Sequence, residues 1–182
     1  MKFNPPFSER SSRIPRPAFA HVRAACPEDL PGIARVESQC FPVERRSSRR
    51  AMRQSLRSPT QSVWVLGRGS DVFGAMVLFH HPKSLRIYSI AVAPECRGTG
   101  GGRRLVRMAL ALARRSGRQT VTLEADANDT RLVNWYASLG FCVYGPPLTG
   151  YYPDGDAVRM RAKVKWDPPA AEKKKAMDDE RK

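Results

Sequence analysis

Apolar residues follow helical and strand periodicities in turn between residues 19 and 164, with glycine and proline at most of the breaks. Apolar residues spaced three and four apart predict helices, and short runs rich in β-branched and aromatic residues predict strands. The predicted helices span residues 27–40, 44–56, 101–116 and 130–139. The predicted strands span residues 19–25, 62–67, 72–80, 85–93, 120–124, 141–144 and 157–164.

The order of these elements is β-α-α-β-β-β-α-β-α-β-β, which predicts a single mixed α/β domain, of the α+β kind. Both ends of the chain lack such periodicity. Residues 1–19 contain four prolines, and residues 166–182 mix lysines with acidic side chains. We therefore expect a flexible arm over residues 1–19, a folded domain over residues 20–165 and a disordered charged tail over residues 166–182.

The composition narrows the class of protein. A length of 182 residues suits one domain with a real core. No run of eighteen apolar residues predicts a membrane span, and the first twenty residues do not resemble a signal peptide. We therefore expect a cytoplasmic protein without a membrane partner. The four cysteines form no Cys-x-x-Cys pair and have no histidine cluster nearby, so we expect reduced thiols and no metal site.

The formal net charge of +15 suggests contact with anions. A phosphorylated ligand, an acidic partner or solvated arginine-rich helix faces would each account for it. Aromatic and basic residues do not interleave, so the charge by itself does not predict a nucleic-acid partner. For the arginines of residues 44–56, we favour a solvated face over attraction of an acidic substrate.

A glycine-rich segment, Arg97-Gly98-Thr99-Gly100-Gly101-Gly102, separates the predicted strand 85–93 from the helix 101–116. Glycines let the backbone approach a ligand closely, and amides at a helix N-terminus bind anions. Arg103 lies in the first helical turn, where a basic side chain suggests that an anion is expected. No Gly-Lys-Ser/Thr follows, which excludes a Walker A loop. The segment therefore predicts a diphosphate cradle.

Three segments in order resemble one protein family. Residues 90–94 (Ile-Ala-Val-Ala-Pro) followed by residues 97–102 resemble the acetyl-CoA motif of GNAT N-acetyltransferases. Residues 134–141 (Asn-Trp-Tyr-Ala-Ser-Leu-Gly-Phe) resemble the family's second signature, with Trp135 in place of leucine. Residues 151–157 (Tyr-Tyr-Pro-Asp-Gly-Asp-Ala), followed by Met160, resemble the ending of RimI-like ribosomal-protein alanine acetyltransferases, one residue shorter.

This resemblance implies the GNAT fold. Its central sheet is mixed and mostly antiparallel, with helices on both faces, and strands 85–93 and 120–124 splay to open a slot for the cofactor. The cofactor implied is acetyl-CoA, without a metal. Its implied ligands lie along the pantetheine arm, around the diphosphate and after strand 120–124: Ile90, Ala91, Val92, Arg97, Gly98, Thr99, Gly100, Gly101, Gly102, Arg103 and one of Asn128 or Asp129. Alternatively, Asp129 caps the following helix.

The same resemblance implies the catalytic roles. Glu124 would deprotonate the acceptor ammonium, and a carboxylate at a strand end beside a cleft suits a general base. Tyr136 would protonate the leaving thiolate, because a phenol is neutral at pH 7 and can donate. Tyr151 and Tyr152 would hold the acceptor. From the residues alone, other roles remain open: Glu124 could be a surface residue, Tyr136 a core residue, and Tyr151 and Tyr152 could only pack.

The resemblance implies an acetyl-CoA-dependent N-acetyltransferase that works by direct attack in a ternary complex, as a monomer or weak dimer. The acceptor implied is a primary amine, with a protein N-terminus favoured. Small molecules, lysine side chains and aminoacyl-tRNA, the last in the manner of an acetyltransferase toxin, remain open as acceptors. So does a catalytically silent domain that only binds CoA.

Overall fold

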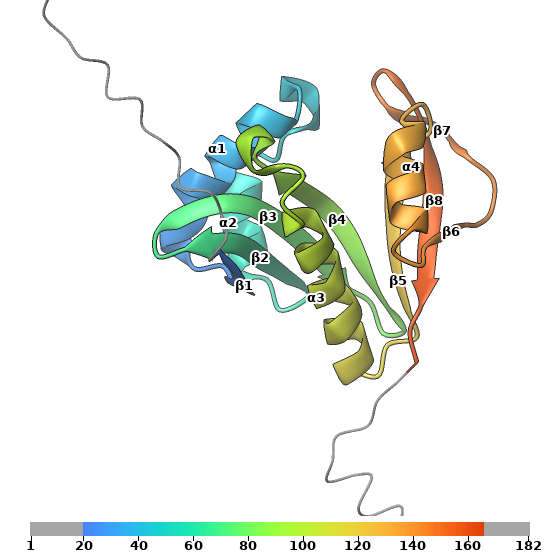
Figure 1. The fold of residues 1–182 in the computed structure, drawn as a ribbon, viewed down its shortest axis with the longest axis horizontal. Helices are drawn as coiled ribbons and strands as arrows, with labels where there is room; N and C mark the ends of the chain where they lie inside the picture. Colours follow the sequence, from blue (N-terminus) through green and yellow to red (C-terminus); the bar gives the residue numbers. More distant parts are fainter. Residues whose placement is uncertain (1–19, 166–182) are drawn as a thin grey trace, which may run out of the picture.

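The computed structural model describes residues 20–165, so the predicted arm 1–19 and tail 166–182 lie outside the described residues. Within that range the chain forms one sheet of eight strands (Figure 1). The strand order is β1-β2-β3-β4-β5-β8-β6, and β7 pairs with β8 beside this path. None of the helices in the described range is long and apolar enough to span a membrane.

The strands are β1 His21–Ala24, β2 Gln61–Arg68, β3 Asp71–His80, β4 Ser84–Val92, β5 Thr120–Asp126, β6 Cys142–Val143, β7 Leu148–Tyr152 and β8 Gly155–Lys163. The α-helices are α1 Leu30–Cys40, α2 Arg49–Arg57, α3 Gly101–Arg115 and α4 Thr130–Ala137. Three short 3₁₀ turns connect them: η2 Pro27–Asp29, η3 Val43–Arg45 and η4 Pro94–Cys96.

Strands β4 and β5 form the one parallel pair among the described strands, and all other pairs are antiparallel. Their pairing runs from Ser84 opposite Thr120 to Ile87 opposite Leu123 and then stops. Both strands continue beyond this point, β4 to Val92 and β5 to Asp126, so they diverge in a wedge (Figure 1). The predicted mixed sheet and the predicted splay are both confirmed.

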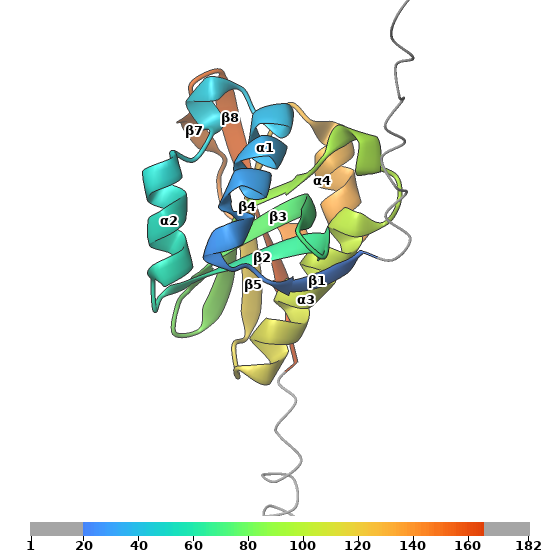
Figure 2. The same cartoon turned by 90° about the vertical axis from the view of Figure 1, so that its left-hand side faces the viewer.

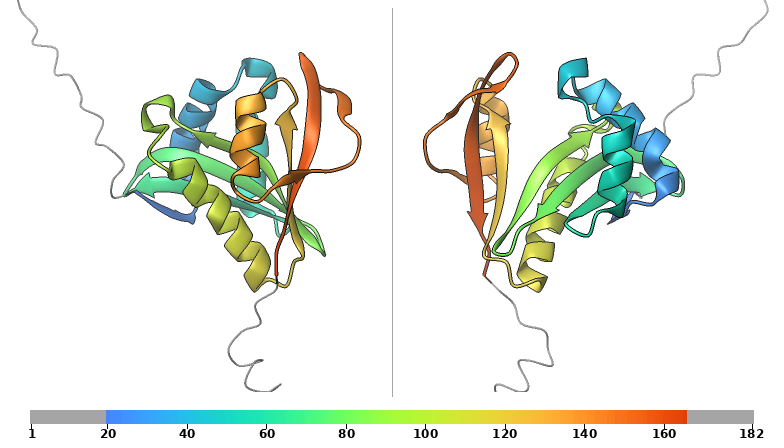
Figure 3. Two further views of the ribbon diagram at one scale, coloured as in Figure 1. Left: turned by 45° about the vertical axis from the view of Figure 1, so that its right-hand side comes forward. Right: turned by 180° about the vertical axis from the view of Figure 1, so that it is seen from behind.

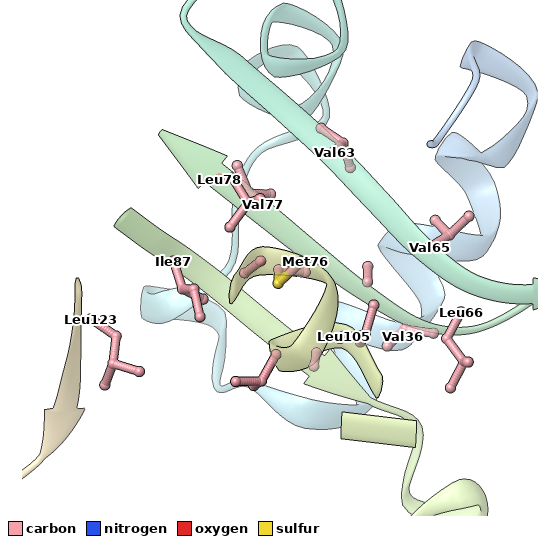
Figure 4. Packing of buried hydrophobic residues seen from close by; sticks show 14 of the residues in the cluster. Val36, Val63, Val65, Leu66, Met76, Val77, Leu78, Ile87, Leu105 and Leu123 are labelled. Carbon is pink, nitrogen blue, oxygen red and sulfur yellow. The ribbon is translucent and has the colours of Figure 1, made fainter. Parts of the chain in front are cut away.

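Helices cover both faces of the sheet. Helices α3 and α4 lie on the face of the sheet that is nearer the viewer in the left-hand view of Figure 3. Helix α2 lies on the other face, which is nearer the viewer in the right-hand view. Helix α1 buries Ile33 and Val36 against β3, and α3 buries Leu105 and Ala109 from the opposite side. These side chains join one core around the central strands β2, β3 and β4 (Figure 4). The predicted arrangement of helices on both faces is confirmed.

Two elements differ from the sequence prediction. The helix predicted over residues 44–56 begins only at Arg49, because the Ser48 side chain accepts a hydrogen bond from the amide of Ala51 and caps it there. The preceding residues form the η3 turn. Strand β7 was not predicted, since it is short, contains Gly150 at a positive φ of 63° and pairs with β8 at only two positions.

Candidate active site

The start of α3 offers free backbone amides. Gly100 is the N-cap at φ 84°, and it provides no side-chain cap. The first helical bond runs from the amide of Arg104 to the carbonyl of Gly100, which leaves the amides before it without an intrahelical acceptor. A Cβ atom at Gly98 or Gly100 would meet nothing within 4 Å, so the loop faces open space. A phosphate group can therefore reach these amides directly.

A groove of about 460 Å³ runs from this loop along β4. Its lining includes the predicted cofactor ligands Ile90, Ala91, Val92, Arg97, Gly98, Gly100, Gly101, Gly102 and Arg103, together with side chains of α4. Thr99 does not line the groove, because its hydroxyl turns back to donate to the carbonyl of Cys96 at 2.7 Å. Most of the predicted ligands therefore share one surface.

The structure places Asn128 and Asp129 elsewhere. Both line a separate hollow at the N-terminus of α4, and neither lines the groove. The Asp129 carboxylate accepts a hydrogen bond from the amide of Leu132 at 2.9 Å and caps α4. The capping alternative therefore accounts for Asp129, and the predicted cofactor contact at this point has no support from the groove.

A β-bulge lies in β4 where the two strands part. Leu78 of β3 pairs with Ile87, and the adjacent Val77 pairs with Ser89, so Tyr88 is an extra residue. Bulges bend a strand and redirect its backbone groups, and they occur often beside active sites. Beyond Ile87, the edge of β4 that faces β5 has no strand partner. The Val92 carbonyl on β4 accepts from Cys40 Sγ at 3.2 Å and from Arg97 Nε at 3.3 Å, and the other backbone groups along this edge can meet a ligand in the wedge.

A second cavity of about 380 Å³ lies on the other side of the wedge. It is lined by η3 and the residues after it, by β4 and β5, and by Tyr151 and Tyr152. The cavity shares Ile90, Leu132 and Tyr136 with the groove. The predicted cofactor groove and the predicted acceptor residues therefore meet at Tyr136.

Tyr136 is nearly enclosed, with 4% of its surface exposed. Its ring packs edge-on against Trp135 at 4.8 Å and Phe141 at 5.7 Å between centroids. Burial raises the pKa of the Tyr136 phenol. Its hydroxyl makes no side-chain hydrogen bond with the described residues 20–165. The phenol is therefore protonated at neutral pH, and Tyr136 lies where the groove and the cavity meet.

Glu124 lies within β5, two residues before its end, and its side chain is 12% exposed. Arg86 of β4 donates from Nε to its Oε2 at 2.8 Å, and from Nη2 to the Tyr151 hydroxyl at 2.8 Å. Sequence reasoning missed Arg86. The available signal was that Arg86 is the single charged residue in the apolar segment of β4. In the structure Arg86 pairs with Thr122, one position before the pairing of β4 with β5 ends. Arg86 thus fixes the predicted base and one predicted acceptor tyrosine together.

Arg45 joins three elements over the cavity. Its guanidinium donates to Asp126 Oδ2 at 3.2 Å and to Asp154, and it lies 3.9 Å from the ring centre of Tyr152. The expectation of a solvated arginine face is therefore wrong for Arg45, whose side chain is only 19% exposed. The reason is that Arg45 belongs to the 3₁₀ turn η3 and not to the α-helix that was predicted to begin at residue 44.

The sequence of residues 30–141 matches the model of the acetyltransferase (GNAT) family. Mycothiol acetyltransferase of Cellulomonas flavigena is 39% identical over 70 residues, which cover 35% of this chain and 20% of the relative. Mycothiol acetyltransferase of Pseudarthrobacter chlorophenolicus is 34% identical over 76 residues, which cover 38% of this chain and 24% of the relative. The chain thus spans about a fifth to a quarter of the length of these curated relatives.

Solved structures share the fold at low identity. The ribosomal-protein-S18-alanine N-acetyltransferase of Escherichia coli has a TM-score of 0.71 and 21% identity, over 81% of this chain and 96% of its own. Ard1 of Thermoplasma volcanium has a TM-score of 0.69 and 22% identity, over 80% and 97%. A GNAT-like decarboxylase, GphF, in complex with isobutyryl-CoA has a TM-score of 0.70 and 20% identity, over 80% and 100%. The predicted likeness to ribosomal-protein alanine acetyltransferases is confirmed for the fold.

Proposed function

The chain belongs to the acetyltransferase (GNAT) family, and we propose that it transfers an acetyl group from acetyl-CoA to a primary amine, specifically the N-terminal amine of a protein. One observation carries this proposal. The groove along the glycine loop and the cavity beside Glu124 share Ile90, Leu132 and Tyr136, and the cavity reaches Ile87 and Leu123, where the pairing of β4 with β5 ends.

The residues of the groove fit acetyl-CoA, which supplies an activated acyl group as a thioester when bound. Amides between Gly98 and Arg103, with the positive end of the α3 dipole, would hold its diphosphate. The unpaired edge of β4 from Ile90 to Val92 would hold the pantetheine arm and donate to the acetyl carbonyl. These residues orient the reacting carbon toward the second cavity.

Glu124 and Tyr136 would carry the protons. Glu124 takes a proton from the acceptor ammonium, and the freed amine attacks the acetyl carbon. As the new C–N bond forms and the C–S bond breaks, the nitrogen loses its second proton to water, and Tyr136 gives its proton to the leaving sulfur. Water then restores the proton of Tyr136 and accepts the proton of Glu124. Arg86 keeps the Glu124 carboxylate beside the acceptor throughout.

The walls of the acceptor cavity support a peptide acceptor. Tyr88 and Tyr151 line the cavity and remain 52% and 40% exposed, so the lining extends onto the surface. A peptide that enters by its N-terminus would cover these rings, whereas a small amine would leave them in water. A small-molecule acceptor is the second candidate, favoured by the 39% identity with a mycothiol acetyltransferase over 70 residues.

The test is acetyl transfer by the full chain to three sets of amines. These are peptides with free N-termini, the same peptides blocked at the N-terminus but carrying lysine, and small amines that include amino sugars. CoA release and the mass of each product are measured, with Glu124→Gln as the control. We expect free N-termini to be acetylated. Transfer to small amines alone would show that the acceptor is a small molecule and not a protein N-terminus. No transfer to any amine by folded protein would refute the proposal.

A further inference from the structure

Helix α2 presents a basic face to solvent. Its nine residues include four arginines, Arg49, Arg50, Arg53 and Arg57, and no acidic residue. All four are exposed, and none forms an ion pair or a side-chain hydrogen bond with another residue of the described range 20–165. The opposite side of the helix buries Met52 and packs against β2.

This charge pattern destabilises the isolated helix. Arg49, Arg53 and Arg57 follow one another at four-residue spacing, where like charges on one face repel. Arg49 and Arg50 also occupy the first turn, where the helix dipole disfavours positive charge. A row of carboxylates along the helix would offset both the repulsion among the arginines and the unfavourable interaction of Arg49 and Arg50 with the helix dipole.

The basic face begins at the wall of the acceptor cavity. Glu44 and Arg45 of η3, with Arg46 and Ser47, line that cavity, and Ser48 caps α2 immediately after them. Figure 2 shows α2 leading away from this turn, and Figure 1 shows it on the half of the sheet that carries β2 and β3, across the wedge from β7. A chain that leaves the cavity on this side therefore meets the α2 arginines next.

We propose that the exposed arginines of α2 dock an acidic stretch of the acceptor polypeptide that follows the acetylated N-terminus. The inference rests on the proposed function. Helix α2 is about 13 Å long at the usual rise per residue, a span of about four extended residues. Once the first two residues fill the cavity, aspartates or glutamates at the third to seventh positions would reach the helix. Arginine forks bind carboxylates in a bidentate manner.

A peptide suits this surface better than a nucleic acid. The exposed side of α2 carries no aromatic residue on which a base could stack. Of the carboxylates that line the cavity, Glu124 and Asp126 are paired with Arg86 and Arg45, and Glu44 of η3 is exposed, so none of them would attract an acidic residue of the acceptor. A preference for acidic residues in the acceptor would then come from the arginines of α2.

The experiment compares peptides that share their first two residues and carry glutamate, glutamine or lysine at the next five positions. The full chain is assayed as wild type, as Arg49→Glu/Arg53→Glu, and as the matched control Arg114→Glu/Arg115→Glu, which reverses two exposed arginines at the far end of α3. We expect the glutamate peptide to exceed the glutamine peptide about tenfold in kcat/KM, through KM, with the advantage shrinking as salt rises. The α2 variant should lose this preference and the α3 variant should keep it.

Two outcomes would overturn the inference. In one, the glutamate and glutamine peptides react equally; in the other, both double variants lose the preference to the same degree, which would indicate general steering by net charge. Inhibition by transfer RNA that depends on Arg49 and Arg53, without any peptide preference, would assign the surface to RNA instead. If no peptide is acetylated, the proposed function fails. Binding of the labelled peptides to the CoA-saturated protein then tests the docking surface by itself. Tighter binding of the glutamate peptide that is lost in the α2 variant would support docking on α2, and equal binding of the glutamate and glutamine peptides would contradict it.

Discussion

Replacement of Tyr136 by phenylalanine should separate catalysis from stability. The ring keeps its packing against Trp135 and Phe141, and the deleted hydroxyl has no side-chain hydrogen bond to lose within residues 20–165. The free energy of unfolding should therefore change by less than about 0.5 kcal/mol. A positioned general acid contributes about 10²- to 10⁴-fold, so kcat should fall by that factor, which corresponds to ~3–5 kcal/mol of barrier.

The assay measures CoA release at saturating acetyl-CoA and acceptor, beside thermal unfolding and calorimetric titration with CoA. Because burial raises the pKa of Tyr136, the phenol stays protonated well into the alkaline range. The wild-type rate should consequently show no loss of an acid below about pH 10. A variant that is stable, binds CoA normally and keeps more than about a third of the wild-type kcat would refute the acid role.

Four further changes test other parts of the structure. Gly100→Ala at φ 84° should destabilise the chain by ~1–2 kcal/mol and weaken CoA binding, as shown by denaturant melts and calorimetry. Glu124→Gln should lower kcat by about 10²-fold or more without changing CoA binding; unchanged turnover would exclude it as the base. Arg45→Met should raise the acceptor KM several-fold, since the roof over the cavity loses its ties to β5 and to the turn after β7, and unchanged KM would contradict this. Arg23 holds the pKa of Asp29 at about 2, below the usual 3.8. This carboxylate therefore contributes about 2 kcal/mol of stability above pH 4, lost as pH falls toward 2, and Asp29→Asn should flatten that part of the curve of stability against pH.

Features that are local in the sequence were predictable. The glycine loop, the helix that starts behind it and Tyr136 each belong to a short segment with its own chemistry, and the periodicity on both sides predicts the elements that hold them. The order of strands and helices also predicted the mixed α/β domain, and the resemblance to the GNAT family implied the mixed sheet. For these features, the local backbone preference and the final fold agree.

Features that depend on distant pairing were not predictable. Arg86 meets Glu124 across 38 residues, and Arg45 meets Asp126 and Asp154 across 81 and 109 residues. No local pattern specifies such partners. The bulge at Tyr88 likewise exists only in the register between β3 and β4. The glycine-interrupted strand β7 forms only because β8 offers its edge, so its sequence reads as a loop.

The most direct test of the account is a calorimetric titration of the full chain with acetyl-CoA and, in parallel, with acetyl-pantetheine, which has the same thioester but no diphosphate. If the amides of Gly98 to Arg103 hold the diphosphate, one acetyl-CoA should bind per chain and acetyl-pantetheine should bind far more weakly. Equal binding of the two compounds, or no binding of acetyl-CoA to folded protein, would contradict the account.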